Sequence, residues 1–219
     1  MDNFNRFIDY TLLKSNASFE DIKKLCLNAI EYNFKCVVVN PFYVEFAKKL
    51  LANTSVGVCC VVGFPLGANK SQVKVFETEL AVNDGVDEID VVLNIGALKS
   101  GMFDLVEKEI YDIVQVAKGK PVKVIIETAL LTDNEKIKVS KIAEKAGANY
   151  IKTSTGFQKG ATSQDVQLIK NNISEYTNIK ASGGIYDLDK AIELISVGAD
   201  RIGTSSGVKL MMQLKEQNK

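Results

Sequence analysis

Two short segments of the chain each place a lysine inside an apolar, β-prone run that ends in small residues and glycine. The first is YIKTSTG at residues 150–156 and the second is IKASGG at residues 179–184. Lysine is rarely buried unless it is paired or functional. One interpretation is that Lys152 and Lys180 extend outward from strand ends. Their occurrence at the same place in two copies of one motif favours an interior, functional location.

Lys152 and Lys180 permit amine chemistry if they lie on neighbouring strands. Parallel strands are about 4.8 Å apart, so similarly placed lysines would bring two ammonium groups close together. Repulsion between the two charges, together with their desolvation, favours the loss of one proton. A neutral amine attacks the carbonyl of a sugar aldehyde, and the resulting imine accepts electrons when a neighbouring C–C bond breaks. These arguments leave open which lysine attacks.

This reaction also needs a group that moves protons to and from the sugar hydroxyl. The chain contains no histidine, so an aspartate or glutamate must do so, directly or through water. Asp90, in DEIDVVLN at residues 87–94, is the best-placed candidate. The alternative is that Asp90 only neutralises a lysine across the interior, and the two roles are compatible.

The elements that must position these residues follow an alternating pattern of β-branched apolar runs and amphipathic windows. This pattern predicts an α/β fold in which helices cover a parallel sheet, and eight evenly spaced strands predict a closed (β/α)8 TIM barrel. The predicted strands are residues 7–11, 36–40, 58–64, 88–94, 122–128, 149–154, 179–182 and 201–204.

Helix signals lie between the predicted strands. Ser18 and Thr132 have the sequence context of N-caps, Pro41 lies where a helix can begin, and Gly147 and Gly198 are expected to end helices. In such barrels the active site is built at the carboxyl ends of the strands. That rule draws attention to the polar residues in or just after the apolar runs: Asp9, Asn40, Asp90, Asn94, Lys123, Glu127, Lys152, Thr155, Lys180, Ser182, Ser205 and Ser206.

Two glycine-containing segments near the end of the chain are candidates for phosphate binding. SGGI at residues 182–185 and GTSSG at residues 203–207 each follow a predicted strand and precede a helix. Glycine allows close backbone approach to an anion, and barrels often bind phosphate after strands seven and eight. The only arginines are Arg6 and Arg201, so backbone and hydroxyl donors are expected to hold the phosphate.

Composition limits the class of protein. The 219 residues include 27 basic and 27 acidic side chains, which gives no indication of a nucleic-acid or acidic-membrane partner. No linker or composition shift divides residues 1–219, so one domain is expected. No signal-like or membrane-spanning segment is found, and the four cysteines contain no C-x-x-C pair, which favours reduced core thiols and a cytoplasmic location.

The chain resembles the deoxyribose-phosphate aldolases, a family of metal-free class I aldolases that fold as (β/α)8 barrels. The matching segments run from end to end: IDYTLLK at 8–14, VVNP at 38–41, GFPLG at 63–67, EID at 88–90, VKVIIET at 122–128, IKTSTGF at 151–157, KASGG at 180–184 and RIGTSS at 201–206.

The resemblance implies reversible cleavage of 2-deoxy-D-ribose 5-phosphate to D-glyceraldehyde 3-phosphate and acetaldehyde, in deoxyribonucleotide catabolism and without a cofactor. It also implies that Lys152 forms the Schiff base, that Lys180 lowers the pKa of Lys152, and that Asp90 donates and accepts protons. The residues that match substrate-binding positions of the family are Asp9, Lys123, Thr155, Gly183, Gly184, Ser205 and Ser206.

Three positions depart from the family pattern. Tyr10 replaces a histidine, Val38 replaces a cysteine, and Tyr186 replaces an arginine that commonly follows SGGI. The last change predicts weaker phosphate binding, or binding by a lysine such as Lys159.

Two other functions remain alternatives. One is another imine-forming sugar-phosphate lyase, such as a transaldolase-like or ketose-phosphate aldolase, which would differ in its donor. The other is a non-catalytic sugar-phosphate-binding barrel, which would need no amine of lowered pKa. Apolar residues on the outward faces of barrel helices also favour a homodimer, without indicating which face forms the interface.

Overall fold

Eight parallel strands close into a barrel in the computed structural model of the chain, which describes residues 3–217. Each strand pairs with the next in sequence, and β8 pairs with β1. The predicted fold class and strand order are therefore confirmed. The strands are β1 (Ile8–Thr11), β2 (Cys36–Val39), β3 (Gly57–Val62), β4 (Glu88–Val92), β5 (Val122–Ile125), β6 (Tyr150–Lys152), β7 (Asn178–Ser182) and β8 (Arg201–Thr204).

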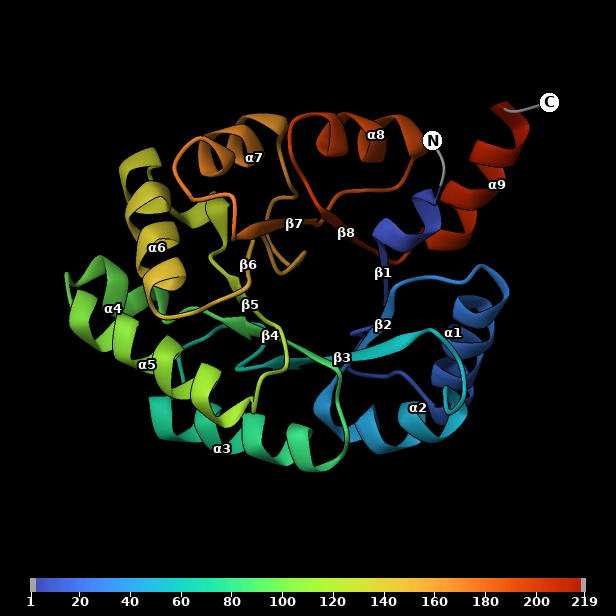
Figure 1. Cartoon of the computed structure of the whole chain (residues 1–219), viewed down its shortest axis with the longest axis horizontal. Helices are drawn as coiled ribbons and strands as arrows, with labels where there is room; N and C mark the ends of the chain where they lie inside the picture. Colours follow the sequence, from blue (N-terminus) through green and yellow to red (C-terminus); the bar gives the residue numbers. More distant parts are fainter. Residues whose placement is uncertain (1–2, 218–219) are drawn as a thin grey trace.

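Helices surround the strands on the outside of the barrel (Figure 1). The α-helices are α1 (Phe19–Glu31), α2 (Val44–Leu50), α3 (Ser71–Asn83), α4 (Ile95–Lys99), α5 (Phe103–Val116), α6 (Asp133–Lys145), α7 (Ser163–Lys170), α8 (Leu188–Ser196) and α9 (Gly207–Gln217). The 3-10 helices are η1 (Phe4–Phe7), η2 (Pro41–Tyr43) and η3 (Thr128–Leu130). Within residues 3–217, none of the helices combines the length and apolarity needed to traverse a bilayer.

The predicted helix caps are present. The Ser18 and Thr132 hydroxyls accept hydrogen bonds from backbone N–H groups three residues later, and each forms a reciprocal capping box. These bonds satisfy amide donors that have no partner inside the first helical turn. Gly147, two residues beyond α6, has a φ of 92°, a conformation that glycine adopts without strain. Pro41 begins η2 rather than an α-helix, and α2 follows it.

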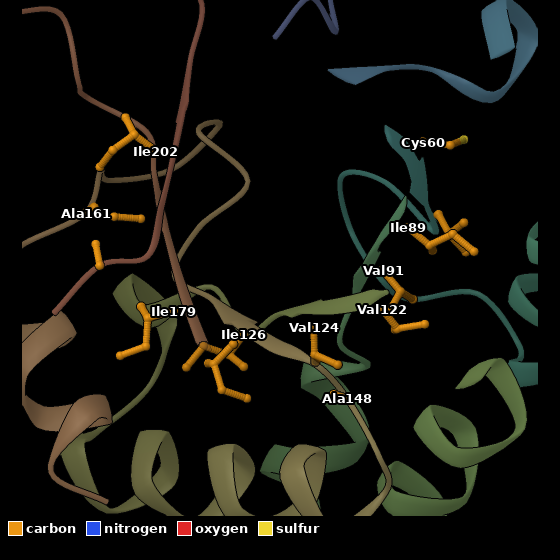
Figure 2. Close-up of a cluster of buried hydrophobic side chains, with 14 of the residues drawn as sticks. Cys60, Ile89, Val91, Val122, Val124, Ile126, Ala148, Ala161, Ile179 and Ile202 are labelled. Atoms are coloured by element: carbon orange, nitrogen blue, oxygen red, sulfur yellow. The ribbon is translucent and has the colours of Figure 1, made fainter. Parts of the chain in front are cut away.

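Side chains alternate along the strands between the barrel interior and the layer beneath the helices. Figure 2 shows part of the outer layer, where Ile89 and Val91 of β4 lie among other apolar side chains from neighbouring strands. The residues between them in sequence, such as Asp90, point to the other face because successive strand residues alternate. The outer layer is apolar and holds the helices on the barrel, whereas the interior is free to carry charge.

Several predicted strands were too long. Asn40, Asn94 and Ser154 lie beyond the ends of their strands, as do Phe64 and Thr128, and Phe7 belongs to η1. In these segments the apolar sequence continues beyond the residue at which the backbone stops pairing with the neighbouring strands. Gly63 and Glu127, for example, have φ values of 62° and 53°, which are outside the extended range of a strand.

Candidate active site

Lys152 and Lys180 lie side by side in the barrel interior. They are register partners on β6 and β7. Their ammonium groups contact the same oxygen of Asp90 on β4, Oδ2, at 2.7 and 2.8 Å. All three side chains are buried, and Lys152 alone retains some exposure, 3%. The structure therefore brings together the three residues that were predicted to carry chemistry.

Asp9 and Lys123 extend this cluster. Asp9 Oδ2 lies 2.5 Å from the Lys180 ammonium, and Lys123 Nζ lies 2.8 Å from Asp90 Oδ1. Both side chains are fully buried. They contact Lys180 and Asp90 and do not border the cavity described below.

Two charged residues of the cluster were not among the predicted site residues. Arg201 Nη1 lies 2.6 Å from Asp9 Oδ1, and Arg201 Nη2 lies 3.2 Å from Glu88 Oε1. Glu88 also pairs with Lys123 at 2.7 Å. The alternation of strand residues could have indicated Glu88, since Glu88 is two residues before Asp90 and therefore shares its face.

Among the described residues, one group of side chains is spaced so that it could hold a metal ion, and Arg201 lies among them. Asp9, Cys36 and Glu88 place potential ligand atoms within 4.8 Å of one another. Arg201 Nη1 lies within hydrogen-bonding range of all three, at 2.6, 3.9 and 3.4 Å respectively. A guanidinium with several donors already satisfies these groups, so the cluster is built around an arginine.

The cluster contains one more basic group than acidic groups. Its basic residues are Lys123, Lys152, Lys180 and Arg201, and its carboxylates are Asp9, Glu88 and Asp90. Lys123, Lys180 and Arg201 each contact two different carboxylates, whereas Lys152 contacts Asp90 alone and shares that oxygen with Lys180. A buried cluster is most stable when its charges balance. Deprotonation of Lys152 would make the numbers of positive and negative charges equal, and it would remove only one ion pair, the pair with Asp90.

The protonation equilibria follow this geometry. Burial lowers the pKa of Lys152; Asp90 opposes the change and Lys180 adds to it. Burial also disfavours the Lys180 ammonium, but Asp9 and Asp90 outweigh that effect and raise its pKa. The two lysines are thus driven in opposite directions, and Lys152 is the one that becomes a free amine more easily.

The sequence argument combined repulsion between the lysines with their desolvation, and the structure ranks these two causes. Desolvation is the largest cause of the lowered pKa of Lys152, and Lys180 contributes less than burial does. The reason is that Asp9 and Asp90 compensate the charge of Lys180 at 2.5 and 2.8 Å. Repulsion is therefore a secondary contribution.

The carboxylates are held ionised. Burial would favour the protonated form of Asp90, but Lys123, Lys152 and Lys180 keep its pKa well below the ordinary value. Lys180 and Arg201 likewise overcome burial and lower the pKa of Asp9 to about 2. Asp90 is therefore an ionised carboxylate, and loss of the charge on Lys152 would increase its proton affinity.

A cavity of about 280 Å³ opens above the cluster. Among the predicted site residues, those lining it are Lys152, Thr155, Gly183, Gly184 and Ser205. Asp9, Asp90, Lys123 and Lys180 are buried beside Lys152 and do not line it. Ser206 follows the lining residue Ser205 but is not part of the lining, and its N–H donates to Thr204 Oγ1 at 2.9 Å. Lys152 is the member of the buried cluster that faces the cavity.

The glycine loops have the backbone geometry expected of an anion cradle. Gly183 and Gly184 have φ values of 85° and 70°, which side chains rarely adopt. The Gly183 carbonyl accepts a hydrogen bond from Ala161 N–H at 3.0 Å, which fixes the loop. Ser205 and Ser206 directly precede α9, whose first-turn N–H groups lack intrahelical partners.

All four cysteines are buried and free, as expected for core thiols. Cys59 lies within the cluster, with Sγ 3.1 Å from Asp90 Oδ1 and 3.4 Å from Lys123 Nζ. Burial and the nearby Asp90 raise the pKa of Cys59 to about 12. It is therefore a neutral thiol, and nucleophilic attack by this group is disfavoured.

Comparison with known proteins gives consistent matches over almost the whole chain. The model of the DeoC/LacD family aldolases matches residues 7–211. The deoxyribose-phosphate aldolase of Finegoldia magna is 52% identical over 94% of this chain and 98% of its own. The solved structure of QR15, an aldolase, has a TM-score of 0.95 at 42% identity and covers 100% of this chain and 98% of its own.

A third relative is the deoxyribose phosphate aldolase of Aeropyrum pernix, which has a unique tetrameric structure. It has a TM-score of 0.90 at 35% identity, over 97% of this chain and 91% of its own. The parallel barrel and these matches define the class of protein, a (β/α)8-barrel aldolase. Within that class, the chain belongs to the DeoC/LacD aldolase family.

Proposed function

We propose that this protein reversibly cleaves 2-deoxy-D-ribose 5-phosphate to D-glyceraldehyde 3-phosphate and acetaldehyde, as a class I aldolase of deoxyribonucleotide catabolism. Relatives that are 52% and 49% identical carry the name deoxyribose-phosphate aldolase. The structural observation that carries the proposal is Lys152, a buried lysine of lowered pKa that borders the cavity.

In this proposal Lys152 is the nucleophile. Its neutral Nζ attacks the C1 aldehyde of the open-chain sugar, and uptake of one proton from solvent with loss of water leaves a protonated imine. The C2–C3 bond then breaks when the C3 hydroxyl loses its proton, and the bonding electrons form an enamine between C2, C1 and Nζ. Protonation of C2 and hydrolysis of the imine release acetaldehyde and restore the amine.

Asp90 and Lys180 support the nucleophile in the same proposal. Asp90 Oδ2 is 2.7 Å from Lys152 Nζ, so the carboxylate can take up and return protons, directly or through water. Lys180 remains charged because Asp9 and Asp90 hold it. Its charge favours the neutral form of Lys152 before attack.

The substrate phosphate is assigned to the loops after β7 and β8. Gly183, Gly184 and Ser205 line the cavity that contains Lys152, and Ser206 begins the turn into α9. Thr155 lines the same cavity and is held by Glu127, which accepts from Thr155 N–H at 3.1 Å. These contacts support a binding position for the sugar phosphate between Lys152 and the backbone N–H groups of these loops.

We further propose that residues 1–219 act as one aldolase domain that is cytoplasmic and needs no metal or cofactor. The closed barrel, whose strands span Ile8–Thr204, supports the single domain; residues 1, 2, 218 and 219 lie outside the described part of the chain. Four free, buried thiols suit a reducing compartment. We also propose a homodimer, in a family that includes the tetrameric relative from Aeropyrum pernix.

Reductive trapping tests the proposed mechanism. Acetaldehyde with borohydride should add an ethyl group to one lysine, and peptide mapping should identify it as Lys152. The variant Lys152→Ala should lose both labelling and turnover, because no other lysine of residues 3–217 is both buried and part of the cavity lining. A ketone donor such as dihydroxyacetone phosphate should give no product, which separates this function from a ketose-phosphate aldolase.

Lys159→Ala is the matched control, since Lys159 lies on the loop after β6 but outside the cavity lining. It should be labelled and turn over like the wild type. Ethylation of Lys180 instead of Lys152 would overturn the assignment of the nucleophile. Stable binding of the sugar phosphate without labelling or product would favour a binding protein over an enzyme.

A further inference from the structure

The cavity presents very little positive charge to a phosphate group. Among the described residues that line it, the only basic side chains are Lys14 and Lys152. Lys152 is bound to Asp90 at 2.7 Å and is needed as a neutral amine in the proposed reaction. Phe157 and Tyr186 also line the cavity, but their rings bring no charge. Lys14 is therefore the one cation at this cavity that is available to a phosphate dianion.

The arginines are occupied elsewhere. Arg201 is buried between Asp9 and Glu88. Arg6 precedes β1, whereas the loop that borders the cavity follows β1. Arg6 donates to the backbone carbonyls of Asn33 and Phe34, at 3.3 and 2.8 Å. Lys159, which the sequence suggested as a substitute for the missing arginine, is exposed and does not line the cavity.

The topology places Lys14 next to the proposed phosphate loops. Lys14 lies on the loop that follows β1, and β1 pairs with β8 through Asp9 and Gly203. The loops that follow these neighbouring strands therefore leave the barrel side by side. Ser205 of the second loop and Lys14 of the first border the same cavity.

The Lys14 ammonium is not committed to another group within residues 3–217. Its side chain is exposed, and no carboxylate oxygen of the described residues lies within 4.0 Å of it. Lys14 contributes to the lowered pKa of Asp21, although the hydrogen bonds from Ser18 contribute more. Asp21 is already engaged in the cap of α1, where Oδ2 accepts from Ser18 N–H at 2.8 Å and from its hydroxyl at 2.6 Å.

We propose that Lys14 binds the phosphate dianion of the substrate and sets the preference for a phosphorylated over an unphosphorylated aldose. The proposal deepens the aldolase function and rests on it. Backbone N–H groups of the glycine loop and of the first turn of α9 donate hydrogen bonds that orient the phosphate, and Lys14 supplies the positive charge that compensates it. Because the lysine is exposed and flexible, its contribution is sensitive to salt.

The test compares kcat/KM for 2-deoxyribose 5-phosphate with that for 2-deoxyribose. In Lys14→Gln the ratio of the two should fall roughly tenfold, as expected for the loss of one charge-assisted hydrogen bond. The fall should come mainly from a higher KM for the phosphorylated sugar. Lys14→Arg should restore most of the preference, and added salt should reduce the ratio more in the wild type than in Lys14→Gln.

Lys159→Gln is the control, because it removes an equal charge from a nearby loop outside the cavity. It should keep the wild-type ratio. An unchanged ratio in Lys14→Gln, or an equal fall in Lys159→Gln, would overturn the assignment. A wild type that cleaves neither sugar would instead contradict the aldolase function. In that case, binding of inorganic phosphate measured by calorimetry still tests Lys14, since Lys14→Gln should bind it roughly tenfold more weakly.

Discussion

At the scale of single residues, the pairing of each lysine decides its chemistry. Lys180 contacts two carboxylates and its pKa is raised, whereas Lys152 shares one oxygen and its pKa is lowered. The neutral amine of Lys152 becomes more abundant as pH rises through its pKa. We therefore expect kcat/KM to rise with pH along an acid limb set by Lys152, and Lys180 to stay charged over that range.

At the scale of secondary-structure elements, a second buried ion pair connects the helices to the strand that carries Asp90. Lys74 of α3 pairs with Glu109 of α5 at 2.7 Å and donates to the carbonyl of Val92, the last residue of β4, at 2.8 Å. Both charged side chains are almost completely buried, at 0% and 2% exposure. This arrangement ties two helices to the end of one strand.

Glu109→Gln should destabilise the protein strongly. It leaves the Lys74 ammonium buried without a countercharge, and breaking a buried pair in this way costs about 3 to 5 kcal/mol. The free energy of unfolding in urea measures the loss. Glu45→Ala on α2 is the control, since Glu45 and its i,i+4 partner Lys49 are both exposed and such pairs contribute about 0.3 to 0.5 kcal/mol. Equal losses in the two variants would contradict the role of the buried pair.

At the scale of the whole molecule, α3 carries its apolar residues on the outside. Its buried residues are Lys74, Thr78 and Ala81, whereas Val73, Phe76 and Leu80 are 49%, 60% and 48% exposed. A groove of about 710 Å³ runs between α3 and α5, and Lys108 and Asp112 border it. An apolar face bordered by charges of both signs can be self-complementary about a two-fold axis.

If the proposed homodimer forms, we expect this face to be its interface. Phe76→Glu should give monomers in size-exclusion chromatography with light scattering, because a carboxylate would be buried without a partner in the dimer. Tyr176→Glu is the matched control, since Tyr176 is 84% exposed elsewhere on the surface, and it should remain dimeric. A wild type that is monomeric at every accessible concentration, or a Phe76→Glu variant that still dimerises, would contradict the prediction.

The sequence predicted the barrel and the central site residues, but it did not predict the whole charged cluster or the main cause of the lowered pKa of Lys152. Alternating apolar runs were enough to predict the barrel, and repetition of the lysine motif was enough to predict that Lys152 and Lys180 are neighbours. Asp90 was predicted from its position in a strand and from the absence of histidine. Arg201 and Glu88 were missed because a charged residue at the start of an apolar strand also suits an exposed strand end. The ranking of burial over repulsion at Lys152 required knowledge of how closely Asp9 compensates Lys180, which is a contact between β1 and β7.

The central claim is that Lys152 loses its proton while Lys180 keeps its own. NMR titration of lysine side chains labelled with ¹³C and ¹⁵N measures both groups directly, with assignments from Lys152→Met and Lys180→Met. The expected result is that Lys152 titrates below the ordinary value of 10.5 and that Lys180 titrates above it. Two ammonium groups that titrate together at or above 10.5 would contradict the claim.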